Sequence, residues 1–433
     1  MGFMFVSLGL LQASRTKLVA AISKLDTFVI ILFIVVQNIK ILNGLKVLEL
    51  ASVLAGPSVG QFLAECGAEV IKVENPGTTG DVTRSWKLST ENPENSVSAY
   101  FSSVNWGKKS LALDITQAEG YKVLLQLVAW ADVVLASYKP GDDIKLGVDY
   151  ATLSAYKEGL VYGHITGYGR TNDKVGYDAI IQAESGFMYL NGEPNGASVK
   201  MPVALVDVLA GHQLKEGILL ALLQKMQSGK GSYVEVSLYQ AAISSLVNQA
   251  TNWLQAGVEP QKMGSEHPNI VPYGRAFDTS DGGQVILAVG NDKQFAQLCR
   301  ILGKEELAQV PEFATNAQRV KNREQVNAHL QALIATWPQE ELLKQLDKAK
   351  IPAGGIQPIS KALQREEAEP LLLHSDKKAG IRQFCAQLEG SSSDTSALLA
   401  PPDYGQQTQQ ILQEVLDFSL QQIEELKQKG ILG

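Results

Sequence analysis

Residues 45–74 read LKVLELASVLAGPSVGQFLAECGAEVIKVE, and this stretch decides the fold. Leu45–Leu50 and Val70–Glu74 are short runs rich in aliphatic residues, which are typical of buried strands. Between them, Gly56-Pro57 predicts a turn and Ser58–Cys66 a helix, which the next glycine ends. A strand, a helix and a second strand in this order predict a βαβ unit and therefore a parallel sheet.

The same alternation continues for about ninety residues. Further strands are expected at Ser110–Asp114, Asp132–Ala136 and Gly159–Thr166, with a helix over Ala118–Ala131 and a break at Pro140-Gly141. The pattern predicts an α/β fold with a large, doubly wound, Rossmann-like domain. In such domains, binding sites lie beyond the carboxyl ends of the strands.

The second half of the chain predicts a smaller α/β domain. Before it come a helix over Val208–Ser228, a strand over Tyr233–Ser237 and a helix that continues to Leu254. The smaller domain contains a strand at Gln284–Val289 and three charged amphipathic helices between Asp292 and Lys350. A loop over Glu389–Pro402 and an amphipathic helix over Thr408–Lys429 follow. We expect a large domain at 43–260, a small α/β domain at 261–365 and a C-terminal segment at 366–433 that returns to the large domain.

The first 42 residues form a non-core hydrophobic leader in this interpretation. The apolar run Phe28–Val36 is too short to cross a bilayer, and extending it backward includes Lys24 and Asp26. A charge at the centre of a membrane span costs about 3 kcal/mol, and no small-residue cleavage site follows. The sequence therefore favours neither a membrane span nor a signal peptide.

Composition narrows the function further. The 433 residues carry a formal net charge of −7, which argues against nucleic-acid binding and means that an anionic ligand needs a local cluster of cations. The three cysteines, Cys66, Cys299 and Cys385, have no CxxC spacing, so we expect small buried apolar residues in a reducing, cytoplasmic protein.

Common cofactor motifs are missing from the sequence. The first βαβ unit has Gly56 and Gly60 but no G-x-G-x-x-G, so a nicotinamide cofactor is not expected. Neither a Walker loop, a G-x-S-x-G elbow nor an H-E-x-x-H pair occurs, and the five histidines show no metal-ligand spacing. We expect no metal and no permanently bound cofactor.

Three adjacent blocks resemble a known family. LELASVLAGP at 48–57, GAEVIKVE at 67–74 and GDVTRSW at 80–86 look like the opening of class III (family III) CoA-transferases, the carnitine dehydratase and bile-acid-inducible operon type. Further matches are Lys108–Asp114, Ala131–Val134, Pro140-Gly141, Thr166–Gly169, Gly176–Asp178, Asp207–Gly211 and His267–Gly274. The resemblance extends from about Leu42 to the C-terminus.

The resemblance implies a transferase with an aspartate nucleophile. The family places this aspartate in a short element that opens a long helix, and the match here is Val206–Gly211, which makes Asp207 the attacking carboxylate. The alternative from the residues alone is that Asp207 only caps the helix. The resemblance also implies an interlocked homodimer, with acyl-CoA and a small carboxylic acid as substrates.

Family contacts to coenzyme A can be transferred residue by residue. They fall on Val53, Ala55, Asn75, Leu113, Ser137, Tyr138, Lys139 and Lys145. Lys72 and Arg84 are further candidates for supplying positive charge, and the family commonly has an arginine at the Asn75 position. For the apolar residues, simple core packing remains an alternative.

Two other functions stay open from the sequence. An acyl-CoA racemase of the same superfamily needs two bases and carries histidine where this chain has Tyr177, whose phenol is a poor base at neutral pH. A non-catalytic CoA-binding subunit would typically lack Asp207. Oxalate exchange is disfavoured because the family members that use oxalate have glutamine at the Leu54 position.

Asp178 is expected to form a polar wall of the acceptor site or a turn. The expected substrate pair is succinyl-CoA with a dicarboxylic or hydroxy acid.

Overall fold

The computed structural model describes residues 40–376, 378–388 and 398–433, so nearly all of the expected leader and residues 389–397 of the expected loop lie outside the described residues. The chain divides into two compact units. Unit 1 comprises the described residues within Met1–Val175, Ala210–Ser237 and Leu371–Gly433, and unit 2 comprises Gly176–Leu209 and Leu238–Pro370. Among the described residues, no helix is long and apolar enough to cross a membrane.

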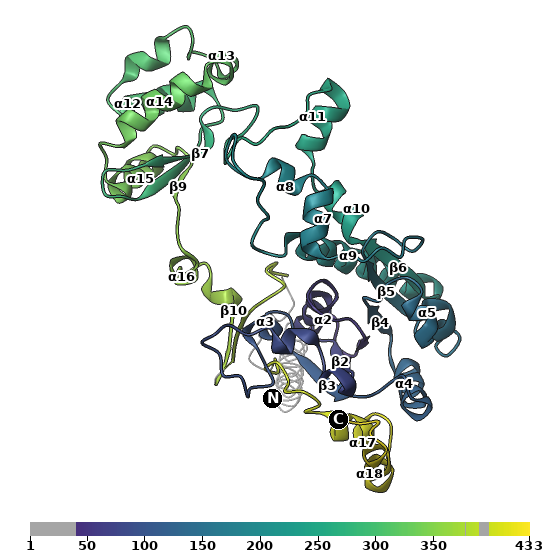
Figure 1. Ribbon diagram of the computed structural model, residues 1–433. Coiled ribbons are helices and arrows are strands. Elements are labelled where there is room, and N and C mark those ends of the chain that lie inside the picture. Colours follow the sequence, from purple (N-terminus) through teal and green to yellow (C-terminus); the bar gives the residue numbers. More distant parts are fainter. Residues whose placement is uncertain (1–39, 377, 389–397) are drawn as a thin grey trace, which may run out of the picture. The chain divides into compact units, whose positions relative to one another are not determined.

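A six-stranded parallel sheet is the centre of unit 1 (Figure 1). Its strands are β1 (Lys46–Glu49), β2 (Glu69–Glu74), β3 (Lys108–Ala112), β4 (Val133–Ala136), β5 (Val161–Thr166) and β6 (Ser232–Ser237). They are hydrogen-bonded in the order β3-β2-β1-β4-β5-β6, and every neighbouring pair is parallel. This order confirms the doubly wound prediction, because the chain reverses its direction of travel across the sheet between β1 and β4.

Helices cover both faces of this sheet because the strands alternate the direction of their side chains. Leu48 of β1 faces a core built with α4 (Ala118–Trp130), whereas Glu49 lies beside Gly60 of α2 (Ala55–Glu65). Every residue of α2 is buried, as expected for a helix with few polar positions. The other short elements of unit 1 are η1 (Pro76–Thr78), η2 (Val82–Ser85), α3 (Ala99–Ser102), α5 (Asp142–Leu146), α6 (Tyr150–Ser154), β10 (Leu372–Ser375) and β11 (Lys378–Ile381).

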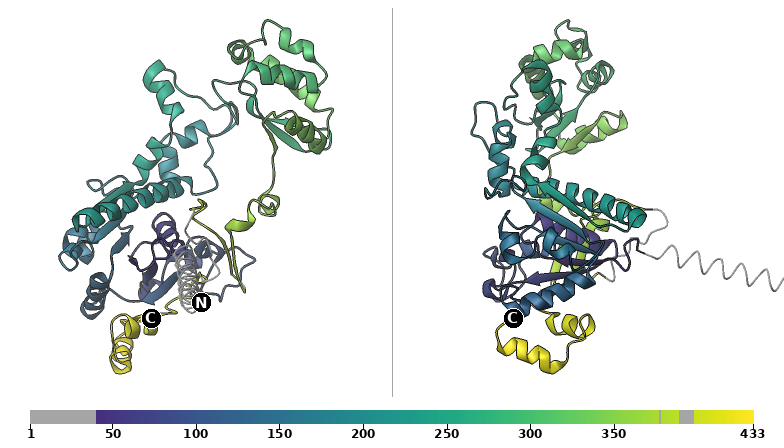
Figure 2. Two further views of the ribbon diagram at one scale, coloured as in Figure 1. Left: turned by 180° about the vertical axis from the view of Figure 1, so that it is seen from behind. Right: turned by 90° about the vertical axis from the view of Figure 1, so that its right-hand side faces the viewer.

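The C-terminal segment adds to unit 1. Helices α17 (Thr408–Glu414) and α18 (Leu420–Gln428) lie next to each other in both views of Figure 2 and contribute Leu412 and Leu426 to the core around α4. Beyond them, the backbone N–H of Asp114 donates to the carbonyl of Ile431 at 2.8 Å. The last residues of the chain are therefore fixed beside the end of β3.

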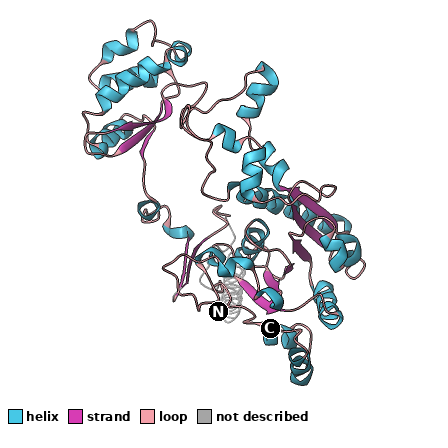
Figure 3. Ribbon diagram, in the orientation of Figure 1, coloured by secondary structure: helices cyan, strands magenta, loops and turns pink. Residues whose placement is uncertain are grey.

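Unit 2 contains a separate core. A three-stranded antiparallel sheet of β7 (Tyr273–Asp278), β8 (Gln284–Ala288) and β9 (Ala353–Gly355) packs with α15 (Gln339–Lys348), as Figure 3 shows. The remaining elements of this core region are α12 (Asp292–Ile301), η3 (Glu305–Gln309), α13 (Asn316–Lys321) and α14 (Arg323–Ile334). Elsewhere in unit 2 lie α7 (Asp178–Glu184), α8 (Phe187–Leu190), α10 (Leu238–Ser244), α11 (Asn248–Ala256) and α16 (Ile359–Ala362), and η4 (Glu369–Leu371) spans the boundary.

Several helix predictions were wrong in detail. Gly56-Pro57 lies inside α2 instead of forming a turn, because proline is tolerated in the first turn of a helix. The helix expected to continue to Leu254 is two helices, α10 and α11, separated at Val247, whose φ is 40°. The helix expected over Thr408–Lys429 is likewise divided, and four α-helices rather than three lie between Asp292 and Lys350.

The cysteines differ from one another. All three are free, and Cys66 and Cys299 are buried as expected. Cys385 is exposed, so the prediction of a buried residue was wrong there.

Candidate active site

Asp207 lies in the first turn of α9 (Leu205–Ser228) and is only 9% exposed. Among the described residues, its carboxylate takes part in no hydrogen bond or ion pair. Burial, together with the nearby negative charge of Asp178, raises the pKa of Asp207 from 3.8 to about 7. The capping alternative is not supported, because α9 begins two residues earlier and the Asp207 side chain accepts no backbone N–H there.

Asp178 anchors the start of the same helix. It is the first residue of α7, and its Oδ1 accepts a hydrogen bond from the backbone N–H of Val206 at 2.8 Å. Its Oδ2 accepts from Gln182 at 2.8 Å and lies 4.0 Å from the Lys200 ammonium. Asp178 therefore does more than form a turn, since it ties α7 to the residue that precedes Asp207.

Tyr177, the residue at the position of the racemase histidine, is oriented differently from its neighbour. It is 62% exposed, whereas Asp178 is buried. Of this predicted pair, Asp178 is the residue whose charge acts on Asp207.

The glycine of the Val206–Gly211 element has a packing reason. A Cβ placed at Gly211 would meet the Ser58 hydroxyl and the carbonyl of Ala55, both in the first turns of α2. Only glycine allows the backbone of α9 to approach α2 so closely within unit 1. The spacing of the motif thus combines a buried carboxylate with a close helix contact one turn later.

Unit 1 contains a cavity of about 690 Å³ at the carboxyl ends of its strands, which we name the sheet-edge cavity. Most of its lining residues end or follow one of four neighbouring strands of the sheet. These residues are Leu50–Ser52 after β1; Lys72–Asn75, Thr78–Val82, Arg84 and Ser85 at and after β2; Leu113, Ile115 and Thr116 after β3; and Tyr138 after β4. The lining is completed by Lys87, Pro93–Ser96, Leu146 and Tyr404. The cavity therefore includes the point between β1 and β4 where a doubly wound sheet is expected to bind ligands.

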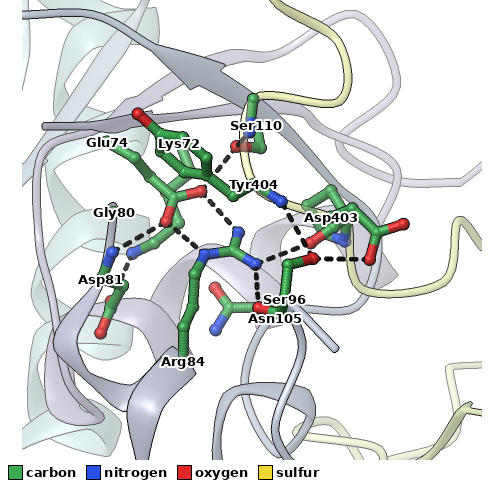
Figure 4. A network of polar contacts seen from close by, with 12 residues as sticks. Lys72, Glu74, Gly80, Asp81, Arg84, Ser96, Asn105, Ser110, Asp403 and Tyr404 are labelled. Carbon is green, nitrogen blue, oxygen red and sulfur yellow. Dashed lines mark hydrogen bonds and ion pairs between the residues drawn. The ribbon is translucent and has the colours of Figure 1, made fainter. Parts of the chain in front are cut away.

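Buried ion pairs form one wall of this cavity (Figure 4). The Arg84 guanidinium lies 2.6 Å from Glu74, and the Lys72 ammonium lies 2.9 Å from Asp81 and 3.0 Å from Glu49. Burial alone would raise the pKa of the Glu74 carboxyl, but Arg84 outweighs burial and lowers it. These side chains are almost fully buried, so the ions stay charged only because each is paired.

The pairing corrects one expectation from the sequence. Lys72 and Arg84 do line the cavity, but their charges are matched by Glu49, Glu74 and Asp81. Neither cation is free to neutralise a phosphate. Lys108, which lies 2.8 Å from Glu49, supplies the third cation for the three carboxylates, so this group of ion pairs is close to neutral.

The predicted CoA contacts fall into two groups. Asn75, Leu113 and Tyr138 line the sheet-edge cavity. The others are absent from its lining: Val53 and Ala55 at the start of α2, and Ser137, Lys139 and Lys145 after β4. Lys139 is exposed and has no ion-pair partner among the described residues, whereas the largely exposed Lys145 lies 3.1 Å from Asp142.

Val53 has a backbone conformation that is unusual for a β-branched residue. Its φ is 72°, in the left-handed region, and its N–H donates to the Asp81 carboxylate at 3.2 Å. Asp81 in turn is held by Lys72 and by the N–H of Thr83. Strain of this kind persists only where surrounding contacts fix it, and it clusters at functional sites.

Sequence reasoning missed two contributors to the cavity. Asp81 belonged to a recognised block, but nothing local indicated that it would hold the Val53 backbone. Tyr404 comes from the C-terminal segment, more than three hundred residues from β2, and its hydroxyl is buried without a hydrogen-bond partner among the described residues. No periodicity or motif signals such a long-range contact.

Metal ligands are not gathered in the described part of the chain. Among those residues, no group of three or more His, Cys, Asp or Glu side chains is arranged to hold a metal ion.

Comparison with known proteins agrees with this geometry. Residues 42–408 match the family model of CoA-transferase family III. The chain is 39% identical over 344 residues to a succinate–glutarate CoA-transferase of Agrobacterium fabrum, covering 78% of this chain and 85% of the relative. It is 34% identical to a human succinyl-CoA:glutarate CoA-transferase, covering 92% of this chain and 91% of the relative.

A solved structure shows the same fold. The crystal structure of a CAIB/BAIF family protein from Brucella suis superimposes with a TM-score of 0.75 at 36% identity, covering 87% of this chain and 99% of that protein. The family model matches most of the chain, and the relatives are matched over most of their own length. The chain therefore belongs to CoA-transferase family III, and it is a CoA-transferase.

Proposed function

We propose that this enzyme moves CoA from an acyl-CoA donor to a carboxylic acid through covalent intermediates on Asp207. One observation carries the proposal: Asp207 is buried and its carboxylate has no partner among the described residues. A buried carboxylate without partners is costly for a fold, so such a group requires a functional explanation. In a family III chain, nucleophilic attack on a thioester supplies it.

The chemistry proceeds in four balanced steps. The Asp207 carboxylate attacks the donor thioester and expels CoA thiolate, which leaves a mixed anhydride. The thiolate attacks the aspartyl carbonyl of that anhydride, which gives an aspartyl-CoA thioester and releases the donor acid. The acceptor carboxylate then attacks this thioester and expels the thiolate again. Attack of the thiolate on the acyl carbonyl of the second anhydride yields the new acyl-CoA and restores Asp207.

The environment of Asp207 suits both halves of this cycle. A pKa of about 7 leaves a large fraction of the carboxylate ionised at neutral pH, so it can attack. Burial also limits water, which would hydrolyse either anhydride. The position of Asp207 at a helix start favours the ionised form, whereas burial and the negative charge of Asp178 raise its pKa and disfavour that form.

We assign the sheet-edge cavity to the uncharged parts of CoA. Its near-neutral wall of paired ions and the side chains of Asn75, Leu113 and Tyr138 suit an adenine ring or a pantetheine arm. The phosphates then bind outside the cavity, where Lys139 is exposed directly after Tyr138. The surface ion pair of Lys145 is weak enough to be exchanged for a phosphate.

The substrate class we propose is a dicarboxylic acid and its CoA thioester, with succinyl-CoA as donor. The relatives named above are described as acting on succinate or succinyl-CoA and glutarate. Lys200 is the only lysine or arginine between Gly176 and Leu209, and its ammonium lies 4.0 Å from the Asp178 carboxylate. We assign Lys200 the role of binding the free, distal carboxylate of the acyl chain. This carboxylate needs a cation because it would otherwise lie beside two aspartates.

We further propose a cytoplasmic homodimer. Leu220, Leu223 and Met226 are exposed within about two turns of α9, as is expected for a surface that a second copy covers. Three free thiols suit a reducing compartment. Sedimentation that shows a stable monomer on dilution would contradict the dimer.

Covalent trapping tests the catalytic proposal. Purified enzyme is incubated with succinyl-CoA and quenched with hydroxylamine or borohydride, and peptide mass spectrometry locates the modified residue. We expect a hydroxamate or a reduced side chain at Asp207 only when acyl-CoA is present. Asp207→Asn is the control, because it keeps the shape of the side chain but cannot attack.

The other functions predict different results. A racemase would exchange the α-proton of an acyl-CoA with solvent and leave Asp207 unmodified. A non-catalytic subunit would bind CoA without either reaction. Both outcomes would overturn the proposal.

A further inference from the structure

A buried histidine lies beneath the loop that follows β4. His164 is on β5 and is 2% exposed. Its Nε2 lies 2.9 Å from the backbone carbonyl oxygen of Tyr138, and its Nδ1 lies 2.9 Å from the hydroxyl of Tyr233. Tyr162 contacts the ring edge-on, with ring centroids 5.9 Å apart. Three neighbours therefore fix the orientation of the imidazole.

The contacts also determine the tautomer. A carbonyl oxygen can only accept a hydrogen bond, so Nε2 must carry the proton and donate a hydrogen bond to the carbonyl oxygen of Tyr138. Burial lowers the pKa of His164, which keeps the ring neutral and makes Nδ1 an acceptor for the Tyr233 hydroxyl. Both polar atoms of the ring are thus satisfied in the neutral form.

The carbonyl that His164 holds belongs to Tyr138, a residue that lines the sheet-edge cavity. β4 ends at Ala136, so the carbonyl of Tyr138 has no place in the strand ladder, and the Tyr138 residue lines the sheet-edge cavity. One residue earlier, the Ser137 hydroxyl accepts the N–H of Ser52, which follows β1. The loop is therefore fixed from two sides, by β1 through Ser137 and by β5 through His164.

We propose that His164 is a positioning residue for CoA binding, which sets the place of Tyr138 in the cavity wall through the Nε2–H donor. This inference rests on the assignment of the cavity to CoA made above. His164 contacts no substrate in this proposal. Its contribution is to the affinity for CoA rather than to the covalent steps at Asp207.

Two substitutions separate the two ring nitrogens. The side-chain nitrogen of His164→Gln reaches the place of Nε2 and keeps a donor for Tyr138, whereas His164→Asn has polar atoms only near the place of Nδ1. We expect the glutamine variant to bind CoA with nearly unchanged affinity. The asparagine variant loses one neutral hydrogen bond to Tyr138 and should bind CoA about fivefold more weakly.

The readouts distinguish positioning from general damage. Calorimetry gives the dissociation constant for CoA, and kinetics give KM for acyl-CoA and kcat at saturating donor. The asparagine variant should raise KM for acyl-CoA and leave kcat within a factor of two. Tyr233→Phe is the matched control, because it removes the Nδ1 contact and keeps the Nε2 contact, so CoA affinity should stay unchanged.

The failures of the two proposals differ. Equal CoA affinities for the glutamine and asparagine variants, or a loss confined to kcat, would overturn the role of His164 while wild-type enzyme still binds CoA. Wild-type enzyme that binds no CoA would overturn the assignment of the cavity itself.

Discussion

The unpaired carboxylate of Asp207 should cost stability in a way that depends on pH. Its pKa rises from an ordinary value of 3.8 to about 7 in the fold, so the folded state holds this proton more tightly than the unfolded chain does. The contribution of Asp207 to the stability of the fold therefore falls as the pH rises from about 4 to about 7, where the folded carboxyl ionises. At 1.36 kcal/mol for each pKa unit, the full effect is about 4 kcal/mol.

Asp207→Asn removes this cost because the amide never ionises. We expect the variant to come closest to wild type near pH 4, where the folded carboxyl is protonated and the unfolded one is only partly ionised. At pH 8 the variant should be more stable than wild type by about 2 to 4 kcal/mol. Urea unfolding of both proteins at pH 4, 5, 6, 7 and 8 measures the difference. The variant should be inactive at every pH, so stability and activity change in opposite directions.

Asp114→Asn is the matched control. Hydrogen bonds from Thr116 and Gln117 lower the pKa of Asp114, so its ionised form stabilises the fold above the unfolded pKa. This variant should be less stable than wild type at neutral pH and close to it in acid. If the difference between Asp207→Asn and wild type is the same at pH 4 and pH 8, the carboxylate is not strained by burial and the reasoning is refuted.

Two further substitutions test the charges of the two units. Lys200→Met should lower kcat/KM for succinate and glutarate at least tenfold and should leave kcat/KM for a monocarboxylic acid such as butyrate within twofold of wild type. Lys200→Arg should keep the preference for dicarboxylic acids. Equal losses of kcat/KM for both classes of acid would exclude the assigned role. Arg84→Met leaves Glu74 buried without its cation and should cost about 3 to 5 kcal/mol of unfolding free energy, which the double variant with Glu74→Gln should partly restore, and calorimetric melting of the three proteins checks this.

Local patterns were sufficient for the elements of the large sheet. β4 is a continuous aliphatic run, and β1 and β2 are rich in aliphatic residues, because a parallel strand is covered on both faces. Such runs can be recognised in the sequence. The breaks at Val247 and Asp417 could not be recognised, because both residues have positive φ without being glycine. Tertiary packing imposes those conformations against the local preference.

The candidate site divides in the same way. The resemblance nominated Asp207 as the nucleophile, which stays a prediction, and it placed Asn75, Leu113 and Tyr138 where the structure has a cavity. The pairing of Lys72 was not predictable, because its partner Glu49 is 23 residues away and lies on a neighbouring strand. A lysine in a sequence shows its charge but not whether that charge is already matched.

The sequence by itself determined the order of strands and helices and the family, and it nominated Asp207 as the nucleophile. These properties depend on residue types at short spacing along the chain, so they can be recognised without knowing the fold. Only the tertiary structure decided that Asp207 is buried without a partner among the described residues, that Lys72 and Arg84 are paired with carboxylates, and that His164 holds the loop of Tyr138. Burial and hydrogen bonding are properties of which distant segments meet, and they set the pKa values and charges on which the chemistry depends.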